Sequence, residues 1–291
     1  MIVGIGGVNI CTEIKEICTP NTKNVDNKKP NIIVEFLENH IIPNNLTFIT
    51  EFDDIKMYKQ FNDYYFFLCG SLILKIEQNN DIWTVMVKKD ISAKAINEIL
   101  IKKILPLYCY NTCIALPLHC TAVKKHKNLL CFSGFSKSGK STLAACMISN
   151  NKYSLVSDDV LYLFYNNDKV YTFPTYSNLK LREDSFKIFN DKIGNFRSMD
   201  YNPLNINNLI IISNEVSDEI IIEKISERKN EYLLQNLFAN SLCEYSLNFL
   251  KLFYCVKNNV ALWKLKYPRN YSVLPQVCEM LETEFKGDCC E

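Results

Sequence analysis

Residues 132–142, FSGFSKSGKST, have the residue types and the spacing of a phosphate-binding loop. Gly134 is followed, after four residues, by Gly139, Lys140 and Ser141, which matches the pattern G-x-x-x-x-G-K-[ST]. In this pattern the backbone N–H groups surround phosphate oxygens, the lysine contacts the β- and γ-phosphates, and the hydroxyl binds Mg²⁺. The sequence therefore predicts a binding site for ATP and Mg²⁺ formed by Gly134, Ser136, Lys137, Ser138, Gly139, Lys140, Ser141 and Thr142.

Two adjacent carboxylates, Asp158 and Asp159, follow a short apolar segment 17 and 18 residues after Ser141. Phosphoryl transfer needs an acid that holds the metal and a group that orients or deprotonates the acceptor hydroxyl. At the end of a strand the backbone can turn and direct both carboxylates into one cleft. The alternative is a surface turn with two capping aspartates, but the position after a phosphate loop favours a catalytic pair.

The elements that must position these residues are visible on both sides of the loop. The apolar segment 129–132 predicts a buried strand, and the segment 143–148 predicts the first turns of a helix. Segment 118–123 is expected to pair with 129–132, and the basic turn 124–127 between them is interpreted as an exposed hairpin tip.

The rest of the chain predicts an α/β protein with a β-rich N-terminal region. Segments 46–51 and 83–88 have strand character, and 63–76 predicts two strands joined at Gly70. Helical spacing then begins after Ser92, a suitable N-cap residue. We place the boundary between residues 1–94 and 95–291. Later strands are expected within 153–164, 170–173, 209–213, 220–225 and 260–265, and later helices within 92–105, 231–250 and 274–285.

Composition narrows the classes of partner. The net charge is +1 over 291 residues, which predicts neither a nucleic-acid surface nor a membrane surface. The longest uncharged segment, 104–123, contains Pro106 and Pro117 and is a poor membrane span. The 13 cysteines form no C-x-x-C pair, and Cys69, Cys131 and Cys146 lie in apolar segments. This usage indicates buried thiols and a cytoplasmic location.

Three segments together resemble the HPr kinase/phosphorylase superfamily. They are LPLHCTAV at 116–123, the phosphate loop at 134–142, and VSDDV at 156–160. The chain looks most like the shorter HPr-kinase-like proteins that are found with peptide-modification genes, including lasso-peptide kinases. The resemblance covers roughly residues 95–285 and implies a P-loop kinase domain of the HPr kinase/PEP carboxykinase type.

The resemblance also implies roles for individual residues. It assigns Asp158 as the general base, Asp159 together with Ser141 as metal ligands, and His119 as a partner that holds the acidic pair by a hydrogen bond. On the sequence alone, a single histidine on an apolar strand is more often a core residue. Arg182 and Arg269 are candidates for contacting the transferred phosphate or the substrate, since a guanidinium group binds phosphate through two donors.

We therefore expect an ATP- and Mg²⁺-dependent kinase that phosphorylates a hydroxyl group, in particular a serine of a peptide or protein. Residues 1–94 would recognise this substrate, and the resemblance implies a homo-oligomer. The family's C-terminal motif, with its additional glutamate, has no convincing match, and Glu183 and Asp184 are the nearest acids. HPr as substrate and the reverse phosphorolysis are thus not predicted.

Other functions remain open from the sequence. The acceptor could be a free metabolite, or the chain could be a nucleotide-dependent switch that has no phosphoacceptor. The absence of an N-K-x-D-like segment and the presence of paired aspartates disfavour the switch. A non-catalytic scaffold is disfavoured because Lys140, Ser141 and the aspartate pair are all intact.

Overall fold

The chain divides into two compact units, residues 1–107 and 108–291, and each is described by itself. The division after residue 107 falls within the helical segment that begins after Ser92, whereas the sequence-based boundary is placed at residue 94. The computed structural model describes residues 2–5, 8–12, 31–36, 42–52, 55–68, 70–79, 82–151, 153–175, 179, 181–189, 202–215, 217–243 and 245–286.

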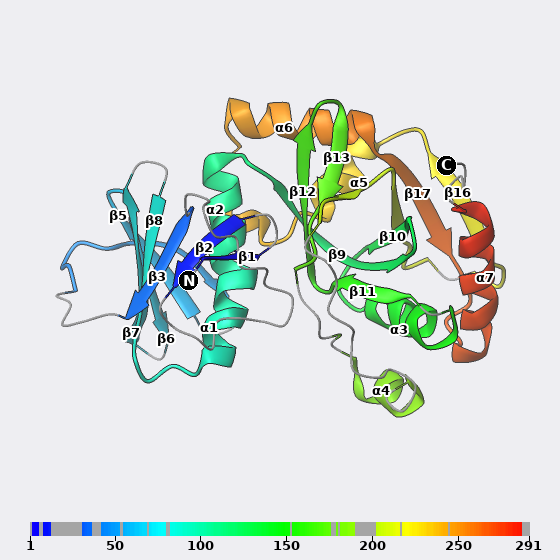
Figure 1. Ribbon diagram of the computed structural model, residues 1–291, viewed down its shortest axis with the longest axis horizontal. Helices are drawn as coiled ribbons and strands as arrows, with labels where there is room; N and C mark the ends of the chain where they lie inside the picture. The colour runs from blue at the N-terminus through cyan, green and yellow to red at the C-terminus, as the bar shows by residue number, and fades with distance from the viewer. Residues whose placement is uncertain are drawn as a thin grey trace. The chain divides into compact units, whose positions relative to one another are not determined.

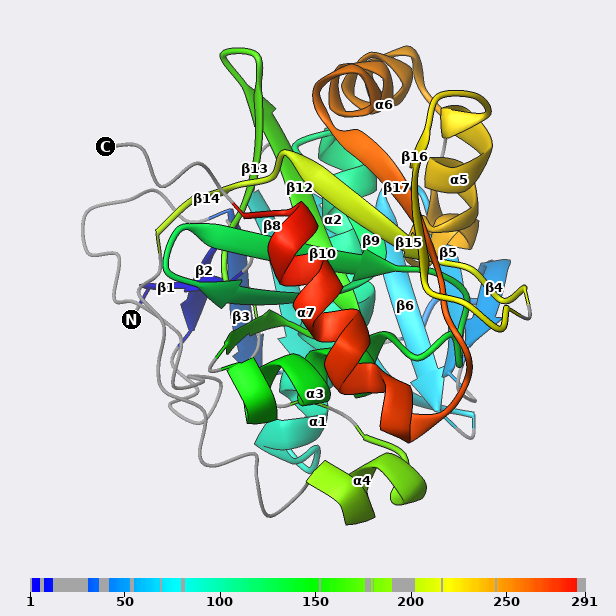
Figure 2. The same ribbon diagram turned by 90° about the vertical axis from the view of Figure 1, so that its right-hand side faces the viewer.

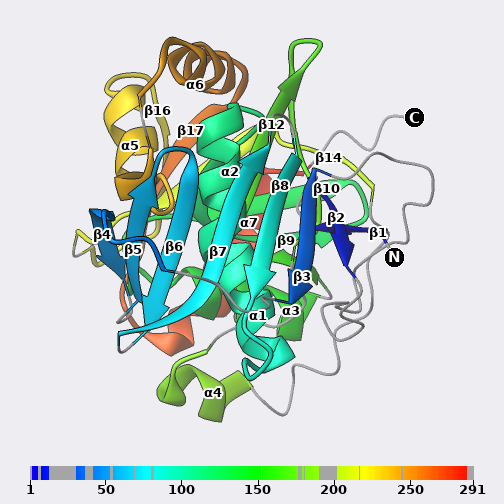
Figure 3. The ribbon, with the colours of Figure 1, turned by 90° about the vertical axis from the view of Figure 1, so that its left-hand side faces the viewer.

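The first unit is built on a mixed sheet whose described strands run in the order β1-β2-β3-β8-β7-β6-β5-β4 (Figure 3). The β2–β3 and β3–β8 pairs are parallel, and the other pairs are antiparallel. The strands are β1 (Ile2–Ile5), β2 (Val8–Thr12), β3 (Ile32–Phe36), β4 (Thr47–Phe52), β5 (Ile55–Gln60), β6 (Asp63–Leu68), β7 (Ser71–Asn79) and β8 (Ile82–Val87).

Local sequence accounts for several of these strands. β6 and β7 form the predicted hairpin, and Gly70 at its turn has a φ of +78°, a conformation that suits glycine. In β8 the alternating residues Trp83, Val85 and Val87 are buried, as expected for a strand with one face in the core.

A continuous helical segment follows the sheet strands and begins as predicted. The Ser92 hydroxyl caps α1 (Ala93–Ile99) by accepting from the backbone N–H of Ala95 at 3.3 Å. The π-helical turn η2 (Leu100–Ile104) and α2 (Leu105–Thr112) continue the helix beyond its predicted end at 105. Pro106 lacks an N–H donor and does not stop the helix, because the wider π turn lies directly before it. Figure 1 shows α1 beside one face of the sheet.

The second unit contains a mixed sheet in the order β14-β13-β12-β9-β10-β15-β17-β16, with β11 paired to β9 (Figure 2). β9 and β10 form the predicted antiparallel pair, whereas β15 is parallel to both β10 and β17. The strands are β9 (Leu116–Lys125), β10 (Asn128–Ser133), β11 (Ser154–Ser157), β12 (Val160–Asn166), β13 (Lys169–Thr172), β14 (Leu204–Asn205), β15 (Asn208–Ile212), β16 (Ile221–Ile225) and β17 (Ala261–Lys266).

Helices cover this sheet. α3 packs against β9, β10 and β11 and lies beside α7, while α6 packs against β12 and β13 (Figure 1, Figure 2). The helices are α3 (Lys140–Asn151), α4 (Glu183–Phe189), α5 (Lys229–Gln235), α6 (Leu247–Asn259) and α7 (Leu274–Glu284), with the 3-10 turns η4 (Asn240–Leu242) and η5 (Tyr271–Val273). The molecule is thus a mixed α/β protein with two mixed sheets.

The helix predicted over 231–250 is wrong, because two helices occupy this region. α5 ends at Gln235, Ala239 has a φ of +51°, and α6 begins only after Ser246. The Ser246 hydroxyl accepts from the backbone N–H of Phe249 at 3.2 Å and starts the second helix. A left-handed residue followed by a new N-cap separates two segments that share one apolar periodicity.

The core between α3 and α7 yields a stability prediction. Leu281 is fully buried in the hydrophobic cluster that holds these helices on the sheet. Leu281→Ala should lower the free energy of unfolding of the second unit by about 2–5 kcal/mol, because it removes apolar contacts and leaves a cavity. Urea denaturation would measure the change. The neighbouring Met280 is 38% exposed, and Met280→Ala should change the stability by no more than about 0.5 kcal/mol. Equal effects of the two substitutions would contradict this packing.

Two further sequence-based expectations concern the cysteines and a membrane span. Cys131 and Cys146 are buried thiols, as predicted, whereas Cys69 lies outside the described residues. Among the described helices, none has the length and apolar character needed to cross a membrane.

Candidate active site

The segment 134–139 connects β10 to α3 as a tight loop. Gly134 has a φ of +145° and Gly139 a φ of +98°, both in the region that favours glycine. A Cβ atom at Gly134 would lie 2.8 Å from the backbone oxygen of Ile212. The Ser138 N–H donates to the Phe135 carbonyl at 3.1 Å. The glycines therefore allow the compact, concave backbone that the pattern requires.

A cavity of about 370 Å³ lies where this loop meets the N-terminus of α3. A helix N-terminus and the backbone N–H groups of such a loop both favour bound phosphate. The cavity contains most of the residues predicted to bind nucleotide and several that were not predicted. Its walls are formed by His119, Ser136, Lys137, Gly139, Lys140, Ser141, Thr142, Asp159, Arg182, Asp184, Ser185, Tyr267, Arg269, Asn270, Tyr271 and Leu274.

The Lys140 ammonium group is held against the start of the loop. Its Nζ donates to the carbonyl oxygens of Gly134 at 2.9 Å and Phe135 at 3.0 Å. Burial lowers the pKa of Lys140, while Cys120 and the carboxylates of Asp158 and Asp159 act in the opposite direction. A buried cation is thus positioned at the cavity by carbonyl oxygens of its own loop.

Asp158 is buried and contacts Ser141 at the end of the phosphate loop. Its Oδ1 accepts from the Thr121 hydroxyl at 2.7 Å and from the Ser141 hydroxyl at 3.0 Å. The residue is only 5% exposed. A buried carboxylate next to the loop serine is an oxygen donor set of the kind that Mg²⁺ prefers.

Asp159 faces the cavity itself, and the backbone explains why the two neighbours differ. β11 and β12 pair antiparallel with successive parts of β9, and Asp158 and Asp159 lie between the paired residues Ser157 and Val160. Asp159 has a φ of +70° at this interruption, a conformation that aspartate tolerates better than most residues. Asp159 lines the cavity, whereas Asp158 contacts the cavity residue Ser141, so the expectation that both carboxylates enter one cleft stays a prediction.

His119 lies on β9 and lines the same cavity. Its backbone N–H donates to the Asn236 carbonyl at 2.8 Å, and the centre of its ring lies 6.1 Å from that of Phe238 in an edge-on arrangement. His119 pairs with Val160 across the strands, next to Asp159. The hydrogen bond from His119 to the acidic pair stays a prediction.

The two predicted arginines both reach the cavity but differ in their contacts. Arg182 precedes α4 and lines the cavity as an exposed residue. Arg269 follows β17 and donates to the backbone carbonyl oxygens of Ser138 and Ser213. Of the nearby acids, Asp184 lines the cavity, whereas Glu183 forms an ion pair with Lys187 at 2.8 Å.

Thr121 and Ser185 contact residues of this site and were not identified from the sequence. Thr121 could have been found, because residues two apart on a strand point to the same face and His119 is its neighbour on that face. Ser185 contacts Thr142 at 2.9 Å and Tyr271 at 3.2 Å through its hydroxyl oxygen, and it comes from a distant helix without any local motif.

The donor atoms present fit ATP and Mg²⁺. No cluster of three or more His, Cys, Asp or Glu residues that could hold a metal occurs among the described residues. Mg²⁺ commonly uses one or two carboxylates together with substrate phosphates, a set that Ser141 and Asp158 would complete here. The glycine-lined loop leaves the close approach that phosphate oxygens need.

The crowding at Gly139 predicts a loss of nucleotide affinity on substitution. A Cβ atom there would lie 2.9 Å from the Tyr267 hydroxyl oxygen and would require a φ of +98°. Gly139→Ala should distort the loop and weaken nucleotide binding by about 5- to 150-fold, since such backbone strain costs on the order of 1–3 kcal/mol. Calorimetry would measure it.

Gly70→Ala is the matched control for Gly139→Ala. Its φ is +78°, but no described atom lies within 4 Å of the added Cβ, and it belongs to the first unit. It carries similar backbone strain without touching the loop, so nucleotide affinity should be unchanged. Normal affinity in Gly139→Ala would show that the loop does not bind phosphate in this conformation.

Comparisons with known proteins add little to this geometry. No protein-family profile matches the chain, and no curated protein matches it. A search of solved structures finds the Hpr(Ser) kinase/phosphatase from Coxiella burnetii, with 14% sequence identity over 59% of this chain and 99% of that chain, and a TM-score of 0.31. A TM-score this low does not establish a common fold.

Proposed function

We propose that the protein is an ATP- and Mg²⁺-dependent kinase that transfers the γ-phosphoryl group to a hydroxyl, specifically a serine of a peptide or protein. The observation that carries this proposal is the contact between the Ser141 hydroxyl and the Asp158 carboxylate, 3.0 Å apart, directly beside the buried Lys140. Phosphoryl transfer requires a phosphate-binding loop, a cationic side chain and oxygen ligands for the metal, and the hydroxyl and carboxylate oxygens of this contact are such ligands.

The contacts favour a division of roles opposite to the one that the sequence resemblance implied. Asp158 touches Ser141 and suits the metal, which would neutralise charge on the phosphates. Asp159 lines the open cavity and suits the acceptor hydroxyl, which it would orient or deprotonate. His119 and Arg182, on the walls of the same cavity, would position the acceptor or the transferred group.

A peptide acceptor is supported by the first unit. A cavity of about 680 Å³ there is lined by aliphatic, aromatic and charged residues of β4, β5 and their neighbours, including Glu51, Lys56 and Tyr58. Across β4, β5 and β6 the rings of Phe48, Tyr58 and Phe67 follow one another with centroids 5.6 and 5.4 Å apart. Peptides often bind to such a sheet surface or add a strand at its edge.

The proposal is tested in two steps. Calorimetry with ATP, with and without Mg²⁺, should show binding that depends on the metal. Incubation with labelled ATP and the peptides encoded beside the gene should then transfer label to a peptide hydroxyl. Binding with transfer only to a small molecule would identify a metabolite kinase, and binding with slow hydrolysis and no acceptor would identify a switch. Absence of nucleotide binding would refute the kinase.

A further inference from the structure

Arg269 connects the phosphate loop to the end of the neighbouring parallel strand. Its Nη1 donates to the Ser138 carbonyl and to the Tyr267 hydroxyl at 3.2 Å, and its Nη2 donates to the Ser213 carbonyl. Ser138 belongs to the loop, whereas Ser213 directly follows β15. Three of the five guanidinium N–H donors are therefore used within the protein itself.

The same arginine packs against the loop at its most crowded position. The guanidinium carbon lies 4.8 Å from the centre of the Tyr267 ring, which is a stacked cation–π contact. A Cβ atom on Gly139 would lie 2.9 Å from the Tyr267 hydroxyl and 3.2 Å from Nη1 of Arg269. Tyr267 is buried, so Tyr267 and Arg269 together restrict the space next to Gly139.

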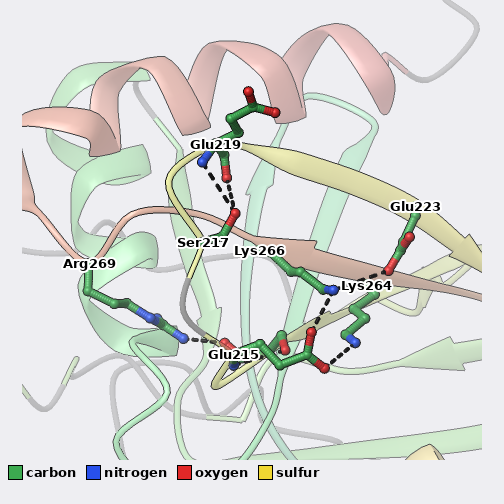
Figure 4. A network of polar contacts seen from close by, with 8 residues as sticks. Glu215, Ser217, Glu219, Glu223, Lys264, Lys266 and Arg269 are labelled. Carbon is green, nitrogen blue, oxygen red and sulfur yellow. Dashed lines mark hydrogen bonds and ion pairs between the residues drawn. The ribbon is translucent and has the colours of Figure 1, made fainter.

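Ser213, which accepts from Arg269, is held in place by contacts with β17. The Ser213 N–H donates to the Leu265 carbonyl at 2.9 Å, and the Glu215 N–H donates to the Ser213 hydroxyl at 3.2 Å. The Glu215 carboxylate contacts Lys264 at 2.6 Å and Lys266 at 2.5 Å (Figure 4). The hydrogen bonds from these two lysines lower the pKa of Glu215 to about 2, so it stays ionised at neutral pH.

We propose that Arg269 is a positioning residue that fixes the conformation of the phosphate loop by attaching the Ser138 carbonyl to the anchored segment 213–215. A trans peptide unit is planar, so the direction of the Ser138 carbonyl sets the opposite direction of the Gly139 N–H. That N–H is one of the donors with which a phosphate loop contacts its ligand. The effect on nucleotide rests on the proposed function, whereas the effect on the free loop does not.

The test compares Arg269→Ala and Arg269→Lys with Arg228→Ala in the full chain. Arg228 is an exposed arginine whose partner is Glu231, at 3.9 Å, and it serves as the matched control. Hydrogen exchange of the peptide that covers 134–143 is measured without nucleotide. In this peptide the Ser138 N–H donates to the Phe135 carbonyl and the Leu143 N–H to the Gly139 carbonyl. Affinities for ADP and ATP and the melting temperature are then measured for each variant.

In both Arg269 variants the loop amides should exchange at least about tenfold faster than in the wild type, because charge-assisted hydrogen bonds are lost. The exchange rates of other peptides and the melting temperature should change little. ADP and ATP affinities should fall by the same factor. Arg269→Lys should not restore slow exchange or nucleotide affinity, because an ammonium group lacks the planar guanidinium geometry that reaches two carbonyls and stacks on Tyr267.

Two results would overturn the proposal. If hydrogen exchange of the loop were unchanged and the affinity for ATP fell more than the affinity for ADP, Arg269 would be a γ-phosphate ligand instead. Faster exchange throughout the second unit would show general destabilisation instead. If the wild-type protein binds no nucleotide, the kinase proposal fails, yet the exchange data from the free protein still decide the role of Arg269.

Discussion

Replacing Lys140 with alanine should raise the Kd for Mg²⁺–ATP by at least about 30-fold. Removing one partner of a buried charged contact costs about 2–5 kcal/mol, and about 1.4 kcal/mol corresponds to tenfold in Kd. Turnover should be lost together with affinity, because the same ammonium group contacts the phosphates before and during transfer. Calorimetric titration and a turnover assay at saturating ATP would measure the two effects.

The Lys140→Ala variant should remain folded, which makes the result interpretable. Burial lowers the pKa of Lys140, so the folded state disfavours the charged side chain, and its removal relieves this cost. Lys169→Ala, which changes an exposed lysine at the start of β13, is the control and should bind normally. Near-normal ATP affinity in Lys140→Ala, with a normal melting temperature, would exclude this loop as the nucleotide site.

Replacing Asp159 with asparagine should spare nucleotide binding and abolish transfer. Asparagine tolerates the φ of +70° at this position, so the turn between β11 and β12 should persist. Loss of a general base typically lowers kcat by about 100- to 10,000-fold. Steady-state turnover of ATP, with a phosphorylated peptide once the acceptor is known, would measure kcat, and calorimetry would confirm the unchanged Kd.

The comparison with Asp158→Asn separates the two carboxylates. Its amide oxygen can still accept from the Thr121 and Ser141 hydroxyls, so the fold should hold, but the loss of charge should remove the Mg²⁺-dependent gain in ATP affinity. Asp168→Asn, in the exposed turn between β12 and β13, is the control for a lost carboxylate. If Asp158→Asn lost turnover with intact Mg²⁺ dependence while Asp159→Asn was active, the roles would be those that the resemblance implied.

The parts of this molecule that were predictable from the sequence depend on neighbours in the chain. Gly134 and Gly139 have the positive φ values that the loop pattern implies, and Ser92 caps its helix. The hairpin of β9 and β10 and the alternation of β8 follow from side-chain periodicity and a short turn. The failure over 231–250 has the same origin, because periodicity alone does not show that Ser246 starts a second helix.

The arrangement of the acids and of Arg269 was decided only by the tertiary structure. Asp158 and Asp159 are adjacent and chemically identical, and they differ because Asp159 adopts a positive φ of +70° where the strand is interrupted between β11 and β12. Arg269 looked like a phosphate ligand, yet its donors meet carbonyl oxygens at Ser138 and Ser213. Residue types and spacing determined which groups are available for chemistry. Which of them face the cavity depends on the local course of the strands and on the tertiary arrangement that brings distant carbonyls within hydrogen-bond reach.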